Sequence, residues 1–97
     1  MILEATIERS SIRKILSELG IASTKLGQND FPDRIFWIPR GRPLLIEFKR
    51  PGEKPRLKQK FVHDYLRSLG YEVYVCYSVE EAFSLVKSAL ETTSVYA

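Results

Sequence analysis

The spacing of apolar residues divides the chain into seven predicted elements. In three stretches apolar residues recur every three or four positions, which is the period of a helix with one buried face. Four shorter stretches are rich in apolar, β-branched or aromatic residues, as strands are. The predicted order is helix, three strands, helix, strand and helix, over residues 3–19, 21–26, 34–39, 44–48, 55–69, 71–77 and 79–90.

Glycine, proline and short polar residues mark the ends of these elements. Gly20 is suited to close the first helix, Pro55 to open the second and Gly70 to end it. The run Ser78–Glu81 matches a capping box at the start of the last helix. We expect one domain that spans residues 1–97 and ends in a loose tail over 91–97.

Charged residues stand at one end of the hairpin predicted for 34–39 and 44–48. The pairing brings Asp33 beside Glu47, and because side chains alternate along a strand, Lys49 projects on the same side as Glu47. An isolated Glu-x-Lys is most often an exposed ion pair. Here the continuously apolar residues before it indicate a strand buried on both faces, where charged side chains need a functional reason.

Two carboxylates beside a lysine favour metal-dependent chemistry. Magnesium and manganese prefer oxygen ligands. A carboxylate-bound cation beside a fixed ammonium group is suited to hydrolysis of a phosphodiester.

Two further polar side chains interrupt or border apolar helical faces. Glu8 falls in the apolar arc of the first helix, either facing the strands or escaping to water in a first turn that the helix dipole makes favourable for acids. Gln59 either faces the strand ends from the border of the second helix's apolar arc or is an ordinary exposed glutamine. That arc consists of Leu57, Phe61, Val62, Tyr65, Leu66 and Leu69.

Composition excludes several other classes of protein. The chain is 44% hydrophobic and 28% charged, with no segment that resembles a membrane span or a signal peptide, so we expect a cytoplasmic protein of a bacterial or phage-infected cell that has no membrane partner. Its one cysteine, Cys76, is expected in the core. Its one histidine, His63, lies away from the apolar arc and is expected in solvent rather than on a metal. The sets of residues needed for a Cys/His zinc site and for a serine triad are therefore incomplete in this sequence.

Basic residues surround the predicted acidic site. The net charge is only +3, but nine lysines and arginines lie between residues 34 and 60, against Glu47 and Glu53 as the acids. Such runs are usually solubilising loops. Their coincidence with the acidic motif instead favours a polyanionic substrate. The nine are Arg34, Arg40, Arg42, Lys49, Arg50, Lys54, Arg56, Lys58 and Lys60.

The order of elements and the motifs together resemble the PD-(D/E)xK nuclease superfamily, and within it the virus-type replication-repair nuclease (VRR-NUC) domain. The resemblance covers roughly residues 4–86 and is closest to stand-alone phage-type members. It rests on Ile7-Glu8, Phe31–Arg34, Ile46–Lys49 followed by Pro51-Gly52, Pro55-Arg56 with Gln59, Leu69-Gly70 and Val73–Val75.

The resemblance implies both a fold and a set of site residues. The fold is an α/β (α+β) fold of the restriction-endonuclease type, with a central mixed sheet flanked by helices. Asp33, Glu47 and the backbone carbonyl of Phe48 are implied as ligands of Mg²⁺ or Mn²⁺, with Glu8 contributing directly or through water. Lys49 is implied as the catalytic lysine and Gln59 as the glutamine that completes the site; no organic cofactor is implied.

We therefore expect a metal-dependent, structure-specific DNA endonuclease similar to a Holliday-junction resolvase. Alternatives are a flap endonuclease, a sequence-specific restriction-type enzyme and a non-catalytic nucleic-acid-binding module. The restriction enzyme needs base-reading insertions that 97 residues scarcely allow, and an inactive module is expected to lose one of the motif residues. The sugar-phosphate backbone is expected to contact Arg34, Arg50, Lys54, Arg56, Lys58 and Lys60.

A homodimer is the expected assembly. Resolving a four-way junction needs two symmetric cuts, and a two-fold dimer supplies two matching sites. Candidate contact residues are Ile12, Ile15 and Leu16, or Phe83, Val86 and Leu90, together with Val95 and Tyr96, although these faces could simply cover the domain's own sheet.

Overall fold

A computed structural model describes residues 3–95 of the chain, with side chains up to residue 93. The predicted order of elements is confirmed. None of the helices in this part is long and apolar enough to cross a membrane. The elements are α1 (Glu4–Leu19), β1 (Ser23–Lys25), β2 (Arg34–Phe36), β3 (Leu44–Phe48), α2 (Leu57–Ser68), β4 (Glu72–Cys76) and α3 (Val79–Val95).

The four strands form one mixed sheet in the order β1-β2-β3-β4. Strand β2 is antiparallel to both β1 and β3, while β3 and β4 run parallel. In the β2–β3 hairpin Arg34 is opposite Ile46, so one step further along the register Asp33 comes beside Glu47, as predicted. Strand β3 is buried along its whole length because it has a neighbour on each side and helices cover both faces of the sheet.

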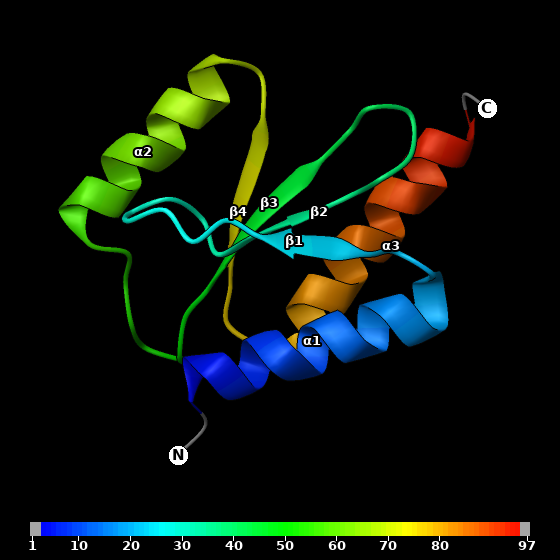
Figure 1. Cartoon of the computed structure of the whole chain (residues 1–97), viewed down its shortest axis with the longest axis horizontal. Coiled ribbons are helices and arrows are strands. Elements are labelled where there is room, and N and C mark those ends of the chain that lie inside the picture. Colours follow the sequence, from blue (N-terminus) through cyan, green and yellow to red (C-terminus); the bar gives the residue numbers. More distant parts are fainter. Residues whose placement is uncertain (1–2, 96–97) are drawn as a thin grey trace.

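Helices cover the two faces of the sheet unequally (Figure 1). On one face α1 and α3 pack together over a core that includes Ile46 and Phe48 of β3. On the other face α2 packs alone over a smaller cluster, which includes Leu45 of β3. Because side chains alternate along β3, Glu47 and Lys49 share the side of Leu45, which α2 covers.

The end of α1 and the start of α3 follow the predicted caps. Helix α2 begins at Leu57, after the N-cap residue Arg56, rather than at Pro55 as predicted. Gly20 closes α1 with φ of 70°. The hydroxyl of Ser78 accepts a hydrogen bond from the backbone N–H of Glu81 at 3.1 Å, as in a capping box. The expected loose tail from residue 91 is wrong as far as Val95, because α3 continues through it, with Ala89 buried against the core. Residues 96 and 97 lie outside the described residues.

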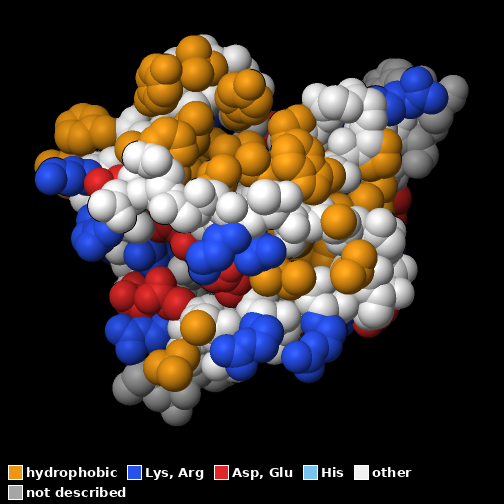
Figure 2. All heavy atoms as spheres, in the orientation of Figure 1, with side chains coloured by type: hydrophobic (Ala, Val, Ile, Leu, Met, Phe, Trp, Pro, Cys, Tyr) orange, Lys and Arg blue, Asp and Glu red, His pale blue; other side chains and the backbone are white. Residues whose placement is uncertain are grey.

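Helix α2 turns a different face to the sheet than its apolar arc predicts. Its buried residues are Gln59, His63 and Leu66, which share one side of the helix. Leu57 and Phe61, on the opposite side, are 68% and 65% exposed. Figure 2 shows hydrophobic side chains gathered on the surface over α2. The helix therefore directs polar groups toward β3 and leaves much of its apolar face in solvent.

The two apolar faces considered for a dimer interface mostly cover the domain's own core. Ile15 of α1 and Val86 of α3 are completely buried, and Ile12 and Phe83 pack beside them. Leu16 is the exception, at 52% exposed. The side chain of Val95 and all of Tyr96 lie outside the described residues.

Candidate active site

The end of β3 carries a buried acid and a buried lysine. Glu47 is 1% exposed and Lys49, which follows the strand, is 8% exposed. The Nζ of Lys49 lies 3.5 Å from Oε2 of Glu47 and 3.7 Å from Oε1 of Glu4 on α1. Burying a charge is costly unless it is paired, so this ammonium group reduces the cost of burying Glu47.

Asp33 joins this site from the start of β2. It follows Pro32, which is fully buried, and its Oδ2 accepts a hydrogen bond from the backbone N–H of Phe48 at 2.7 Å. Burial raises the pKa of Asp33 above its ordinary value, against the lowering effect of that hydrogen bond, and the neighbouring carboxylates Glu8, Glu47 and Glu4 raise it further. The site is thus a group of mutually repelling acids, which a bound cation stabilises.

Glu8 faces this group of acids and is tied to the sheet by cations. Its side chain is 14% exposed and accepts a hydrogen bond from Nη1 of Arg34 at 3.2 Å. Nζ of Lys25 lies 3.7 Å from the same carboxylate oxygen. Of the two alternatives, Glu8 therefore faces the strands. Lys25 was not predicted from the sequence, although it stands directly opposite Arg34 in the β1–β2 register.

Gln59 is also on the side of its helix that faces the sheet. Its side chain is buried, with 8% of the residue exposed, and its Oε1 accepts the backbone N–H of Arg56 at 2.7 Å. This hydrogen bond satisfies one of the backbone donors at the start of α2. The amide is thereby held in a fixed position at the N-terminal end of the helix.

The structure contradicts the prediction that the side chain of His63 lies in solvent. His63 is 2% exposed, and its Nε2 lies 2.9 Å from Oε1 of Glu47. The expectation of a solvated side chain is wrong because buried Glu47 requires a hydrogen-bonding partner, and only the tertiary packing of α2 on β3 brings the two together. The signal in the sequence was the spacing, since His63 follows Gln59 by four residues and so shares its face of the helix.

The arrangement of oxygens fits a hard divalent cation with a small number of protein ligands. Oε2 of Glu47 is buried and accepts no hydrogen bond within the described part of the chain. Across residues 3–95 no three His, Cys, Asp or Glu side chains converge as a complete metal site. Mg²⁺ typically keeps several waters and takes only one or two carboxylates, so the pair Asp33 and Glu47 is a sufficient set of side chains for it.

Basic side chains surround these acids. Figure 2 shows acidic side chains between α1 and α2 with Lys and Arg side chains around them. Arg50 pairs with Glu53 at 2.6 Å. Exposed lysines on the segment before α2 and on its first turns are Lys54, Lys58 and Lys60.

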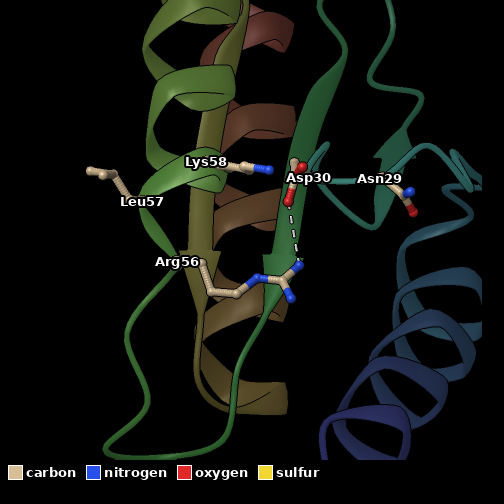
Figure 3. A pocket seen from close by; sticks show the side chains of 5 residues that line it. All are labelled: Asn29, Asp30, Arg56, Leu57 and Lys58. Atoms are coloured by element: carbon tan, nitrogen blue, oxygen red, sulfur yellow. Dashed lines mark hydrogen bonds and ion pairs between the residues drawn. The ribbon is translucent and has the colours of Figure 1, made fainter.

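A cleft of about 570 Å³ lies between the loop before β2 and the start of α2 (Figure 3). It is lined by Asn29, Asp30, Arg56, Leu57 and Lys58. The guanidinium of Arg56 pairs with Asp30 at 3.3 Å, and the side chain of Lys58 also points toward Asp30. The cleft is open and cationic on its helical side.

Cys76 is a core residue, as predicted. It is 3% exposed and packs in the cluster between the sheet and α1 and α3. Burial raises the pKa of its thiol to about 12, so the thiol is protonated at neutral pH and is not a nucleophile.

The sequence of the chain matches a family of known proteins. The family model of the VRR-NUC domain matches residues 2–80, which include all five side chains predicted for the site. The chain is 35% identical over 77 residues to "Putative nuclease p44" of Acyrthosiphon pisum secondary endosymbiont phage 1, covering 77% of this chain and 83% of that protein.

Two solved structures share the fold. One, a VRR_NUC domain, superposes with a TM-score of 0.75 at 26% identity and covers 87% of this chain and 94% of its own. A second, a VRR_NUC domain protein, has a TM-score of 0.77 at 18% identity and covers 94% of this chain and 90% of its own. The matches in sequence and in fold thus extend over the elements that carry the acids, the lysine and the glutamine, and the chain belongs to the VRR-NUC domain family.

Proposed function

We propose that this protein is a divalent-metal-dependent DNA endonuclease that hydrolyses phosphodiester bonds. The observation that supports this most directly is Glu47, a buried acid placed beside Asp33 and Lys49, one oxygen of which accepts no hydrogen bond from the described residues. A buried charge left partly unsatisfied is costly to fold and is found at functional sites. Membership in a nuclease domain family supports the same function.

The cation is Mg²⁺ or Mn²⁺, held by the side chains of Asp33 and Glu47 and the backbone carbonyl of Phe48. Glu8 contributes directly or through a water. When bound, the ion supplies a water of lowered pKa and neutralises charge on the scissile phosphate. The hydrogen bond from Phe48 N–H to Asp33 holds this carboxylate against β3 and so limits the movement of one ligand relative to the other.

Lys49 and Gln59 act on the substrate rather than on the cation. Lys49 either positions the attacking water, accepts a proton from it as a neutral amine, or stabilises, as an ammonium group, the charge that develops on the phosphate. Gln59, with its Oε1 held by Arg56, presents its amide to that water or to a phosphate oxygen. Arg34, by contrast, is bonded to Glu8 and Ser23, so it orients the helix acid in addition to any contact with DNA.

The basic residues around the site bind the sugar-phosphate backbone. Lys58 and Arg56 line the cleft of Figure 3, beside the loop that leads to Asp33. Contacts of this class hold DNA in position without reading its sequence, so shape determines the choice of substrate. The other backbone-binding residues are Arg34, Arg50, Lys54 and Lys60.

A cleavage assay tests this function. Purified protein is incubated with duplex, flap and four-way-junction DNAs in Mg²⁺ or Mn²⁺, and in excess chelator as the control. We expect cleavage only with metal, strongest on branched DNA and insensitive to base sequence. Full activity in chelator contradicts metal dependence, binding without cleavage of any substrate indicates a non-catalytic module, and dependence on a short base sequence indicates a restriction-type enzyme.

The functional unit is a homodimer that cuts branched DNA with paired sites, and its contact surface is the exposed apolar stripe of α2. We define the stripe as Leu57, Phe61, Tyr65 and Leu69, each of which is more than half exposed. Paired antiparallel about a two-fold axis near the middle of the helix, the stripe is self-complementary, with leucine facing leucine at the ends and Phe61 facing Tyr65.

The size of the stripe is compatible with a small dimer interface. It extends over about 18 Å of helix. Eight large side chains from two copies supply on the order of 1,000 Å² of contact, the lower limit for a specific interface. The free edge of β4 is a poorer alternative, because Arg67 donates two hydrogen bonds to the carbonyl of Val73, at 2.7 and 3.2 Å, and so occupies an acceptor of that edge.

Replacing Phe61 or Tyr65 with serine is expected to convert the dimer to a monomer. Because the dimer is two-fold symmetric, each substitution removes two aromatic rings, one from each copy, from the centre of the interface. Light scattering at micromolar concentration should report twice the chain mass of 11.2 kDa for the unaltered protein and the single mass for Phe61→Ser. Leu16→Ser is the matched control, since Leu16 is also exposed but lies on α1. If Leu16→Ser is a monomer and Phe61→Ser is still a dimer, the interface lies on α1. If the unaltered protein is a monomer that cuts only flaps, it is a flap endonuclease.

A further inference from the structure

The imidazole of His63 is buried against the acidic site, and the reaction proposed above makes no use of it. It is 2% exposed and its Nε2 lies 2.9 Å from Oε1 of Glu47. An ionised carboxylate can only accept hydrogen bonds, so Nε2 carries the hydrogen and donates it. This contact occupies one of the two oxygens of Glu47, while the other, Oε2, has no hydrogen bond to any residue in the part of the chain that the structure describes.

Helix α2 packs on the sheet with polar residues inward, and a gain in stability alone does not explain this orientation. The helix buries Gln59 and His63 over the end of β3, while Leu57 and Phe61 remain largely in solvent. Replacing buried polar pairs by apolar residues of similar volume is often neutral or stabilising. A helix that packs on its sheet only for stability is therefore expected to place apolar residues, rather than Gln59 and His63, over the end of β3.

We propose that His63 is a positioning residue for the metal site: by donating to Oε1 of Glu47, it holds the carboxylate so that Oε2 faces the cation. The inference rests on the proposed function. Two contacts restrain the two oxygens of Glu47: His63 contacts Oε1, and Nζ of Lys49 lies 3.5 Å from Oε2. At Oε2 the ammonium group of Lys49 would give way to a bound cation, whereas the hydrogen bond from His63 to Oε1 would stay in place. Hydrogen bonds to ligating groups typically change metal affinity or activity by about 10- to 100-fold.

The test measures Mn²⁺ binding by isothermal titration calorimetry together with thermal unfolding of the metal-free protein. His63→Leu fills the space without a donor, and His63→Gln restores an N–H donor. Leu66→Ala is the matched control, because Leu66 is buried on the same side of α2 but packs on apolar residues. We expect His63→Leu to weaken Mn²⁺ affinity by about 10- to 100-fold, and also to lower the thermal stability of the metal-free protein, because Oε1 of buried Glu47 loses its hydrogen bond. His63→Gln should recover most of the affinity, and Leu66→Ala should lower stability but leave affinity unchanged.

The outcomes separate this inference from the proposed function. Normal Mn²⁺ affinity in His63→Leu overturns the role of His63 while leaving the function intact. If His63→Gln loses as much Mn²⁺ affinity and as much thermal stability as His63→Leu does, the role of His63 is purely structural and the inference is also overturned. Absence of Mn²⁺ binding in the unaltered protein overturns both. If His63→Leu does not fold, His63→Met, with a more adaptable side chain and no donor, takes its place.

Discussion

Asp33→Ala and Glu47→Gln are each expected to lower the rate of DNA cleavage by at least about a hundredfold, since even partners of metal ligands can contribute that much. Both changes remove a carboxylate from the proposed metal site. Glutamine keeps the shape of Glu47 and an oxygen that can accept the hydrogen bond from His63, so its effect is that of lost charge rather than lost packing. The measurement is single-turnover cleavage of a labelled four-way junction in Mn²⁺.

DNA affinity should survive these substitutions. DNA binding depends on the surrounding lysines and arginines, and removing a negative charge beside them makes the binding of a polyanion more favourable. Asp64→Asn is the matched control, because Asp64 is an exposed acid elsewhere on α2, with 75% of its side chain accessible. Cleavage at the normal rate by Asp33→Ala or Glu47→Gln, with the control also normal, removes the basis for the proposed metal site.

Lys49→Met is expected to slow cleavage by about a hundredfold to ten-thousandfold, the range for loss of a proton-transfer group, while Mn²⁺ still binds. Lys49 contributes no ligand, and its ammonium group lies 3.5 Å from Oε2 of Glu47, where a cation competes with it. Removing this ammonium group leaves Glu47 buried without its charge partner, so the metal-free protein should also be less stable. Bound Mn²⁺ should restore part of that stability.

Calorimetry and thermal unfolding, each with and without Mn²⁺, distinguish these effects. Lys87→Met on α3 is the control, because Lys87 is exposed and carries the same change of charge. A Lys49→Met protein that cleaves normally excludes a catalytic role for this lysine. One that has lost Mn²⁺ binding although it is folded shows that Lys49 supports the metal site rather than the chemistry.

The local pattern of residues predicts the elements well and their terminal residues less well. Helical and strand periods arise from contacts within a few positions, so α1, α2, β3 and β4 are evident from the sequence. Strands β1 and β2 are shorter than predicted, three residues each, because strand length depends on how far a neighbour pairs. The helical propensity of residues 91–95 was underestimated, since α3 continues through them.

The sequence by itself determines the order of elements, the register of the β2–β3 hairpin and the approach of Asp33 to Glu47. These follow from alternation along strands and from the direct connection of β2 to β3 by the loop over residues 37–43, which are local properties. The tertiary structure alone decides which side of α2 faces the sheet. The helix carries an apolar arc wide enough to pack in more than one orientation, and it is the buried charge of Glu47, far away in the sequence, that makes inward placement of His63 favourable. The pairing of partly buried Glu8 with Arg34 and the exposure of Phe61 are decided in the same way, by contacts between elements that no local period encodes.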